Sequence, residues 1–257
     1  MRFFYDNLID ASGVVVTTSS EQSDLPAANV THEHKAKVWR TGSSVALEYV
    51  VFDLGSAQSV TSCIIFNHTL LNTDTLIKIQ GNSSDSWASP AVDETLTWSS
   101  GAIFKVFAGG SYRYWRFTFT KASAGVTRDI GRIFLGTYYT TTEQPDDDGL
   151  DIRPDDLSVT TVSRGGQEWT DARPQYRAFH VSFSAINSTQ TDNFKTISDA
   201  VGEHTPFFVV IDETASTSLP TGEMLYVKFK KAVGRKVNSH DGSEYKWDVK
   251  MELKEQL

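Results

Sequence analysis

Apolar and polar residues alternate with a period of two along most of the chain, and this pattern restricts the fold more than any other feature. Val45, Leu47, Tyr49 and Val51 form one face of such a run, which ends in the turn-like sequence Phe-Asp-Leu-Gly at 52–55. Alternation predicts a strand, because successive side chains of a strand point to opposite faces of its sheet. Clusters of Gly, Ser, Asn and Asp separate the runs, which favours an antiparallel sandwich over βαβ units.

Further runs of the same character cover both halves of the sequence. In the first half, strands are predicted at 62–67, 75–81, 103–107, 112–120 and 130–135. In the second half, they are predicted at 157–164, 176–186, 207–212, 224–231 and 245–253, with a closing hairpin that turns at 238–242. The predicted fold class is therefore all-β.

One helix is predicted at about 188–201. Asn187 or Ser188 can accept hydrogen bonds from the first unpaired N–H groups, and Gly202 supplies a stop. Phe194, Ile197 and Val201 lie on one face of that helix, as a segment packed against a sheet requires.

The composition changes at 140–149, a polar and acidic stretch that contains Asp146, Asp147 and Asp148. We interpret 140–156 as a linker between a first domain at 1–139 and a second at 157–257. A calcium loop is the alternative, but the stretch lacks the alternate ligand positions and the bidentate Glu that such a loop needs.

Charge and cysteine content exclude several classes of function. The formal net charge of −8 argues against nucleic-acid binding, which depends on Lys and Arg neutralising phosphates. Cys63 is the only cysteine, so no intrachain disulfide can form, and its apolar neighbours predict a buried thiol. No segment has the length of apolar sequence that a signal peptide or a membrane span requires. We therefore expect synthesis and assembly in the cytoplasm, without membrane insertion.

Two histidines and a Trp-Arg pair are the first candidates for a functional site. His32 and His34 could offer two imidazoles to a metal ion, but no further ligands with a suitable spacing accompany them. Trp39 is expected to cover one end of the core, and the two histidines on the connection before it are expected to lie in solvent or at a contact with a neighbour. Neither a Gly-x-Ser-x-Gly elbow nor a phosphate-binding loop is present. No metal, cofactor or enzymatic activity is therefore predicted, and an enzyme is the least favoured class.

Trp87 lies in the polar loop 84–90 and is the aromatic residue best placed to meet a ligand. An exposed Trp there could stack on a sugar or on a partner protein, and a Trp folded over the end of the barrel is an equal alternative. The candidate contact residues are therefore Trp87, His32, His34 and Arg40.

The first half resembles discoidin-type domains, the galactose-binding-like jelly rolls that include the C domains of coagulation factors. The resemblance spans about residues 10–136 and rests on four motifs in order: Leu-Pro-Ala-Ala-Asn at 25–29, Val-Trp-Arg-Thr at 38–41, Val-Phe-Asp-Leu-Gly at 51–55 and Tyr-Trp-Arg-Phe at 114–117. It implies a jelly-roll sandwich that binds ligands in the loops at one end. Secreted members usually join their termini by a disulfide, which this chain cannot form.

The second half resembles, more loosely, the β-rich domains of distal-tail and tube-like ring proteins of bacteriophages. This resemblance implies a second β-sandwich with one short helix and a structural role in the tail or tail tip of a long-tailed phage. The implied partners are a homo-oligomeric ring, the tube, hub and tape-measure proteins, and a host surface glycan, in a virion assembled in the host cytoplasm. The alternative is a free carbohydrate-binding module with an accessory β domain.

Overall fold

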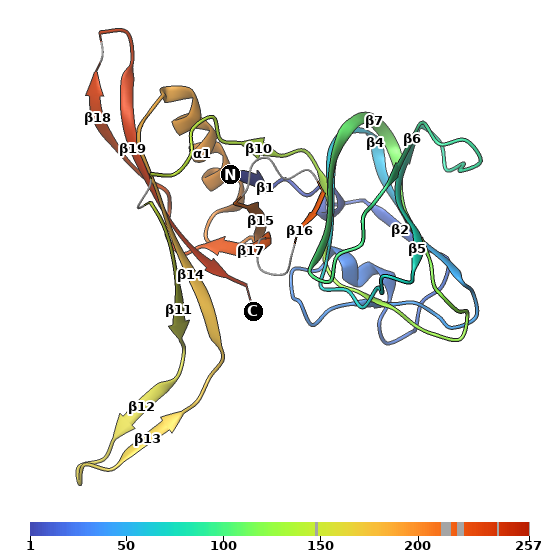
Figure 1. Ribbon diagram of the computed structural model, residues 1–257, viewed down its shortest axis with the longest axis horizontal. Helices are drawn as coiled ribbons and strands as arrows, with labels where there is room; N and C mark the ends of the chain where they lie inside the picture. Colours follow the sequence, from blue (N-terminus) through green and yellow to red (C-terminus); the bar gives the residue numbers. More distant parts are fainter. Residues whose placement is uncertain (147–148, 212–216, 220–223, 241, 257) are drawn as a thin grey trace. The chain divides into compact units, whose positions relative to one another are not determined.

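A computed structural model describes residues 1–146, 149–211, 217–219, 224–240 and 242–256. The chain forms two compact units (Figure 1): unit 1 comprises Met1–Thr140 and Phe208–Leu225, and unit 2 comprises Thr141–Phe207 and Tyr226–Leu257. The described residues form strands, two 3-10 turns and one α-helix, so the predicted all-β fold class with one helix is confirmed.

Unit 1 is built around an antiparallel sheet with the strand order β2-β4-β7-β5-β6. These strands are β2 (Val15–Thr18), β4 (Leu47–Phe66), β5 (Thr75–Asn82), β6 (Val92–Thr95) and β7 (Ala102–Thr120). β9 (Ile133–Gly136) also pairs with β4, and β16 (Thr217–Leu219) pairs with β7.

Shorter strands and turns complete unit 1. β3 (Trp39–Arg40) pairs with β8 (Asp129–Ile130), and β1 (Arg2–Phe4) pairs with both β10 (Tyr139–Thr140) and β15 (Phe207–Val210). The 3-10 turns are η1 (Leu8–Asp10) and η2 (Ala27–Thr31). The N-terminal strand of the chain therefore lies between two strands that are distant in sequence.

β4 and β7 are each longer than the sequence predicted, and this corrects two expectations. The predicted turn at 52–55, and the segment 108–111 that separates the predicted strands 103–107 and 112–120, both lie inside these strands. Gly55 (φ +75°) and Gly109 (φ +73°) adopt the left-handed conformation there, and the pairing changes register between Asp53 and Gln58. A Cβ atom at position 109 would meet the carbonyl of Val60. The glycines therefore produce irregularities within two paired strands, and the strands continue past them.

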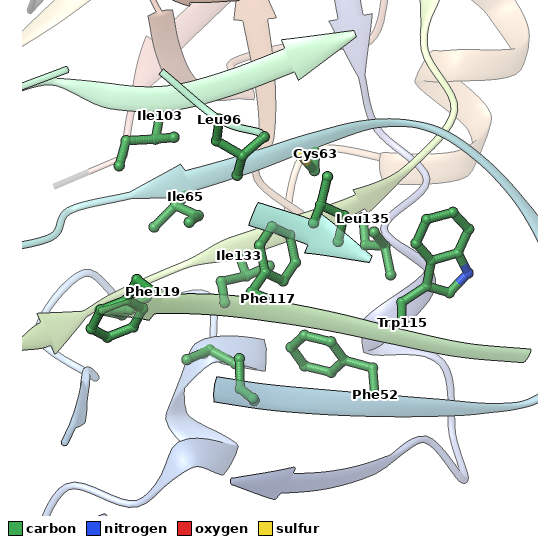
Figure 2. Close-up of a cluster of buried hydrophobic side chains, with 14 of the residues drawn as sticks. Phe52, Cys63, Ile65, Leu96, Ile103, Trp115, Phe117, Phe119, Ile133 and Leu135 are labelled. Carbon is green, nitrogen blue, oxygen red and sulfur yellow. The ribbon is translucent and has the colours of Figure 1, made fainter. Parts of the chain in front are cut away.

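The core of unit 1 consists of side chains from alternate positions of these strands. Figure 2 shows Phe52, Phe117 and Trp115 lying against residues of neighbouring strands. The rings of Phe52 and Phe117 are 6.2 Å apart and nearly perpendicular, which is a favourable arrangement for two aromatic rings. Cys63 belongs to the same cluster and is fully buried, as predicted, and burial raises the pKa of its thiol.

Unit 2 has one antiparallel sheet with the strand order β17-β19-β14-β11, and β18 also pairs with β19. The strands are β11 (Leu150–Asp156), β14 (Gln175–Ile186), β17 (Met224–Phe229), β18 (Gly234–His240) and β19 (Tyr245–Glu255). A separate two-stranded ribbon, β12 (Val159–Val162) with β13 (Glu168–Asp171), extends the hairpin of β11 and β14 (Figure 1).

Part of the predicted linker takes a regular structure. β11 falls within 140–156, whereas Asp147 and Asp148 lie outside the described residues. The division into domains at 1–139 and 157–257 stays a prediction. Of the predicted turn at 238–242, Asp241 lies outside the described residues, as does Asp212 of the predicted strand at 207–212.

The predicted helix is confirmed as α1 (Ser188–Val201), which lies beside β19. The Asn187 side chain accepts a hydrogen bond from the Gln190 N–H at 2.8 Å, and Gly202 at φ +56° ends the helix. Phe194 is buried with its ring 4.9 Å from that of Phe183 on β14. The apolar face of α1 thus packs against the sheet.

Candidate functional site

Trp87 is held over the outer face of the unit 1 sheet by a cation-π contact. The residue lies between β5 and β6 and is half-buried. The Arg116 guanidinium carbon is 4.5 Å from the centre of the Trp87 ring, close enough for attraction between the cation and the ring. The indole N–H donates to the Asp85 carboxylate at 2.6 Å. These two contacts fix the orientation of the indole ring.

Strand register places a row of polar side chains beside this tryptophan. Asp93 of β6 lies opposite Gln80 of β5, which in turn lies opposite Arg116 of β7. Gln80 accepts from the Arg116 guanidinium at 2.9 and 2.5 Å and donates to Asp93 at 3.0 Å. Tyr49 of β4 completes the row, with its ring centre 5.6 Å from the guanidinium carbon. Tyr49, Gln80, Asp85, Trp87, Asp93 and Arg116 are called the Trp87 face below.

The Trp87 face holds two carboxylates and one guanidinium, and Lys78 beside the face forms an ion pair with Asp93 at 2.9 Å. Burial lowers the pKa of Arg116, although Tyr49, Asp85 and Asp93 act in the opposite direction. Burial would raise the pKa of the Asp93 carboxyl, but hydrogen bonds from Lys78 and Gln80 outweigh it, so that this pKa lies below its usual value. Both groups are therefore charged at neutral pH.

This combination of groups suits a neutral polyhydroxylated ligand. An indole ring offers an apolar face that a sugar ring can cover, while carboxylate, amide and guanidinium groups accept and donate hydrogen bonds to hydroxyls. No proton-transfer pair or activated nucleophile accompanies them among the described residues of the face. Stacking and hydrogen bonding are the interactions that these groups can offer to a ligand.

His32 and His34 lie together on the connection between η2 and β3. Their rings are stacked with centres 5.1 Å apart, both residues are exposed, and the His34 N–H donates to His32 Nδ1 at 3.3 Å. Within the described ranges, no group of three or more His, Cys, Asp or Glu residues could hold a metal ion. His32 and His34 therefore lie at the surface of unit 1 as candidate contact residues.

An open cleft of about 610 Å³ lies next to the two histidines. Its lining includes Asp10 of η1, Val16 of β2, Thr31 at the end of η2 and Glu33 between the two histidines. Burial raises the pKa of Asp10, although its ion pair with Arg132 opposes the change. The cleft carries two carboxylates and no aromatic side chain, so it lacks the ring platform that the Trp87 face provides.

Arg40 and Trp39 serve the packing of unit 1. Arg40 forms a two-pronged ion pair with Asp129, with N–O distances of 2.6 and 2.7 Å. Trp39 is fully buried, and its indole N–H donates to the Ser20 carbonyl at 3.0 Å. Arg40 thus contacts Asp129 on β8, whereas Trp87 contacts Arg116 on β7. Of the four candidate contact residues, only His32 and His34 contact each other.

Sequence reasoning singled out Trp87 as a candidate contact residue, but it did not predict the residues that lie around it. Gln80 and Arg116 are 36 residues apart, and their neighbourhood depends on the pairing of β5 with β7. The sequence does contain one sign of Arg116: it stands between two aromatic residues in Trp115-Arg116-Phe117, and a polar residue in such an alternation marks the outward face of a strand.

None of the described helices is long and apolar enough to cross a membrane.

Comparisons with known proteins found no matching family model and no matching curated protein. Among solved structures, a module named CpGH89CBM32-6 produced by Clostridium perfringens has 19% identity and a TM-score of 0.42, covering 51% of this chain and 98% of its own. A chitosan-binding module from a chitosanase/glucanase of Paenibacillus sp. IK-5 has 19% identity and a TM-score of 0.41, covering 51% and 99%.

A GH29 fucosidase from Ruminococcus gnavus in complex with fucose has 16% identity and a TM-score of 0.46. The alignment covers 53% of this chain but only 28% of the fucosidase. All three therefore match about half of the chain at low identity, and these values identify no ligand for it.

Proposed function

We propose that the protein is a non-catalytic glycan-binding protein, in which unit 1 is a carbohydrate-binding module and unit 2 is an accessory β domain. The observation that carries the proposal is the oriented indole of Trp87, held by Arg116 and Asp85 beside a row of hydrogen-bonding groups. A sugar ring on this indole would place its hydroxyls near Asp93 and Gln80. Stacking supplies affinity and the polar row supplies orientation.

A glycan array with the full chain tests this function. The wild-type protein is expected to bind a defined set of glycans, and Trp87→Ala to lose at least about fivefold in affinity, because one stacked aromatic ring contributes about 1–3 kcal/mol. The double variant His32→Ala/His34→Ala is the matched control, since it changes two exposed rings away from Arg116. Loss of binding in the histidine variant with retention in Trp87→Ala would contradict the proposal.

A second candidate is a structural component of a long-tailed phage tail, assembled into a ring with copies of itself and with the tube, hub and tape-measure proteins. The ribbon of β12 and β13 favours it, because Trp169 on this ribbon is 76% exposed. Val159, which is 47% exposed, lies on the same face of the ribbon, and exposed apolar side chains that lie together are typical of interaction surfaces. In this role, unit 1 would contact neighbours or a host glycan within the virion.

Electron microscopy of the purified protein, alone and mixed with candidate tail proteins, tests the second candidate. Closed rings of this chain, or its incorporation into tail particles, are the expected result. A protein that stays monomeric and is absent from purified particles would refute the structural role without affecting glycan binding by unit 1.

A further inference from the structure

The ribbon of β12 and β13 in unit 2 exposes apolar side chains that the described part of the chain does not cover. All eight residues of the two strands are exposed, and the strands pair only with each other among the described elements. Trp169 is 76%, Val162 58% and Val159 47% exposed. A two-stranded ribbon is marginally stable in water, so burial against a partner would stabilise it.

The two faces of the ribbon differ in chemistry. Thr161 lies opposite Trp169 and Val159 lies opposite Asp171, so these four side chains share one face. Glu168 precedes Trp169 and points to the other face. β13 thus presents an aromatic ring on one face and a carboxylate on the other, one residue apart.

The edge strand β18 has complementary features. All seven of its residues are exposed, and it pairs only with β19 among the described strands. Its basic residues Arg235 and Lys236 project to opposite faces. Arg235 lies 3.8 Å from the Asp192 carboxylate of α1 and 6.0 Å from the centre of the Trp247 ring, and its side chain is about one third exposed. Charged residues on an edge strand disfavour pairing with a like-charged strand, but they leave the edge open to an acidic one.

A hollow of about 340 Å³ lies beside β18, lined by Gly234, Arg235, Lys236, Asp248 and Lys250. Asp248 is engaged by the Asn238 amide at 2.7 Å and by the Ala185 N–H at 3.1 Å, and these hydrogen bonds hold the pKa of its carboxyl below its usual value. Lys236 and Lys250 share one face of the β18–β19 pair, because Lys236 lies opposite Asp248 and Lys250 lies opposite Gly234, and their ammonium groups can meet an aromatic ring there through cation-π contacts.

The ribbon cannot reach this edge within its own chain. The ribbon continues from the end of β14 at Gln175. The other end of β14, at Ile186, pairs with Trp247 of β19, and β18 lies alongside this part of β19. The 12 residues of β14 separate these ends by about 36 Å at about 3.3 Å per residue. Figure 1 shows β18 and the ribbon at opposite ends of the unit 2 sheet.

We propose that β13 of one copy pairs in parallel with the β18 edge of a second copy of this chain. In the proposed register, Trp169 lies beside Lys236, and its indole is on the side of the hollow. Glu168 then lies beside Arg235 on the other face. Main-chain hydrogen bonds of the added strand supply affinity, and the two side-chain contacts fix the register. Because the two surfaces differ, copies associate head to tail, which gives a closed ring or a filament.

This contact deepens the second candidate function and is independent of glycan binding by unit 1. Its test is a charge exchange across the proposed contact, read by sedimentation equilibrium of the full chain. Wild type is expected to self-associate, and Glu168→Lys or Arg235→Glu alone to raise the dissociation constant at least about tenfold, since each sets like charges opposite one another. Trp169→Ala is expected to weaken association by a similar factor.

Restoration distinguishes a direct contact from a general effect on folding. The single chain carrying both Glu168→Lys and Arg235→Glu is expected to self-associate again, as is an equimolar mixture of the two single variants. Arg153→Glu, a charge reversal at an exposed site on β11, is the matched control and should leave association unchanged. If none of the three contact substitutions weakens self-association, this contact is overturned, whereas a ring formed through another surface is still compatible with the result. A wild type that is monomeric at all concentrations would overturn both.

Discussion

At the scale of single residues, a buried ion pair decides which face of β4 enters the core. Glu48 and Lys121 are both fully buried, with an N–O distance of 2.8 Å, and the Ser20 hydroxyl donates to Glu48 at 2.7 Å. The core face of β4 therefore begins with Glu48 and continues with Val50, whereas Leu47 is 54% exposed. The apolar pattern at 45–51 could not reveal this, because the partner of Glu48 is 73 residues away.

Removal of one partner of this pair is expected to destabilise unit 1 strongly. Lys121→Met leaves the Glu48 carboxylate buried without its counter-charge, and such uncompensated charges cost about 3–5 kcal/mol in free energy of unfolding. Urea denaturation of the variant measures the loss. Lys195→Met, which breaks the exposed pair with Asp199 on α1, is the matched control, with an expected effect below about 0.5 kcal/mol. Equal effects of the two variants would contradict the assigned role.

His68 gives stability a dependence on pH. Burial lowers the pKa of its imidazole to about 4, against about 6.5 in an unfolded chain. The unfolded state therefore binds the extra proton first as the pH falls, so that the free energy of unfolding decreases between about pH 6.5 and 4, by at most about 3 kcal/mol.

The variant His68→Gln isolates this effect from that of other groups. Denaturation of wild type and His68→Gln at pH 7 and pH 4.5 measures the free energy of unfolding of both proteins. Relative to the wild type, the variant is expected to be more stable at pH 4.5 than at pH 7. A difference that is the same at both pH values would show that the imidazole titrates alike in the folded and unfolded states.

At the scale of secondary structure, local signals predicted α1 better than any strand. Its cap, its apolar face and its terminal glycine all lie within 16 residues (187–202) and all have the predicted roles. Asn187→Ala should lower the free energy of unfolding by about 1 kcal/mol, because the side-chain acceptor for the Gln190 N–H is lost. Asn187→Ser keeps an acceptor and is expected to recover most of the loss in urea denaturation. No change in Asn187→Ala would contradict the capping role.

Strands depend on partners that are distant in sequence, and this limited what the sequence could predict. The alternating runs located β5, β14, β17 and β19, but they could not show that β4 and β7 continue through Gly55 and Gly109. The ribbon of β12 and β13 was partly missed because all its side chains are exposed, so its sequence has no buried face to mark it. Trp87 was identified from its loop, whereas Arg116 reaches it only through strand pairing.

At the scale of the whole molecule, the two units offer different kinds of surface. Unit 1 has a buried, largely apolar core and presents the oriented Trp87 ring on its outer sheet face. Unit 2 packs one helix against one sheet and extends an exposed ribbon with Trp169 at its surface. The first surface suits a small polar ligand and the second suits another strand. This division of surfaces is the physical basis for the two proposals, glycan binding by unit 1 and self-association through unit 2.

Glycan binding by the Trp87 face is the central claim, and a binding isotherm tests it most directly. Titration calorimetry with the strongest glycan from the array would compare wild type, Trp87→Ala and Asp93→Asn. Asp93→Asn is expected to weaken binding less than Trp87→Ala, because it retains one acceptor for a sugar hydroxyl. The predicted result is that Trp87→Ala raises the dissociation constant at least about fivefold and leaves the enthalpy of unfolding unchanged. An unchanged dissociation constant in Trp87→Ala would contradict the claim.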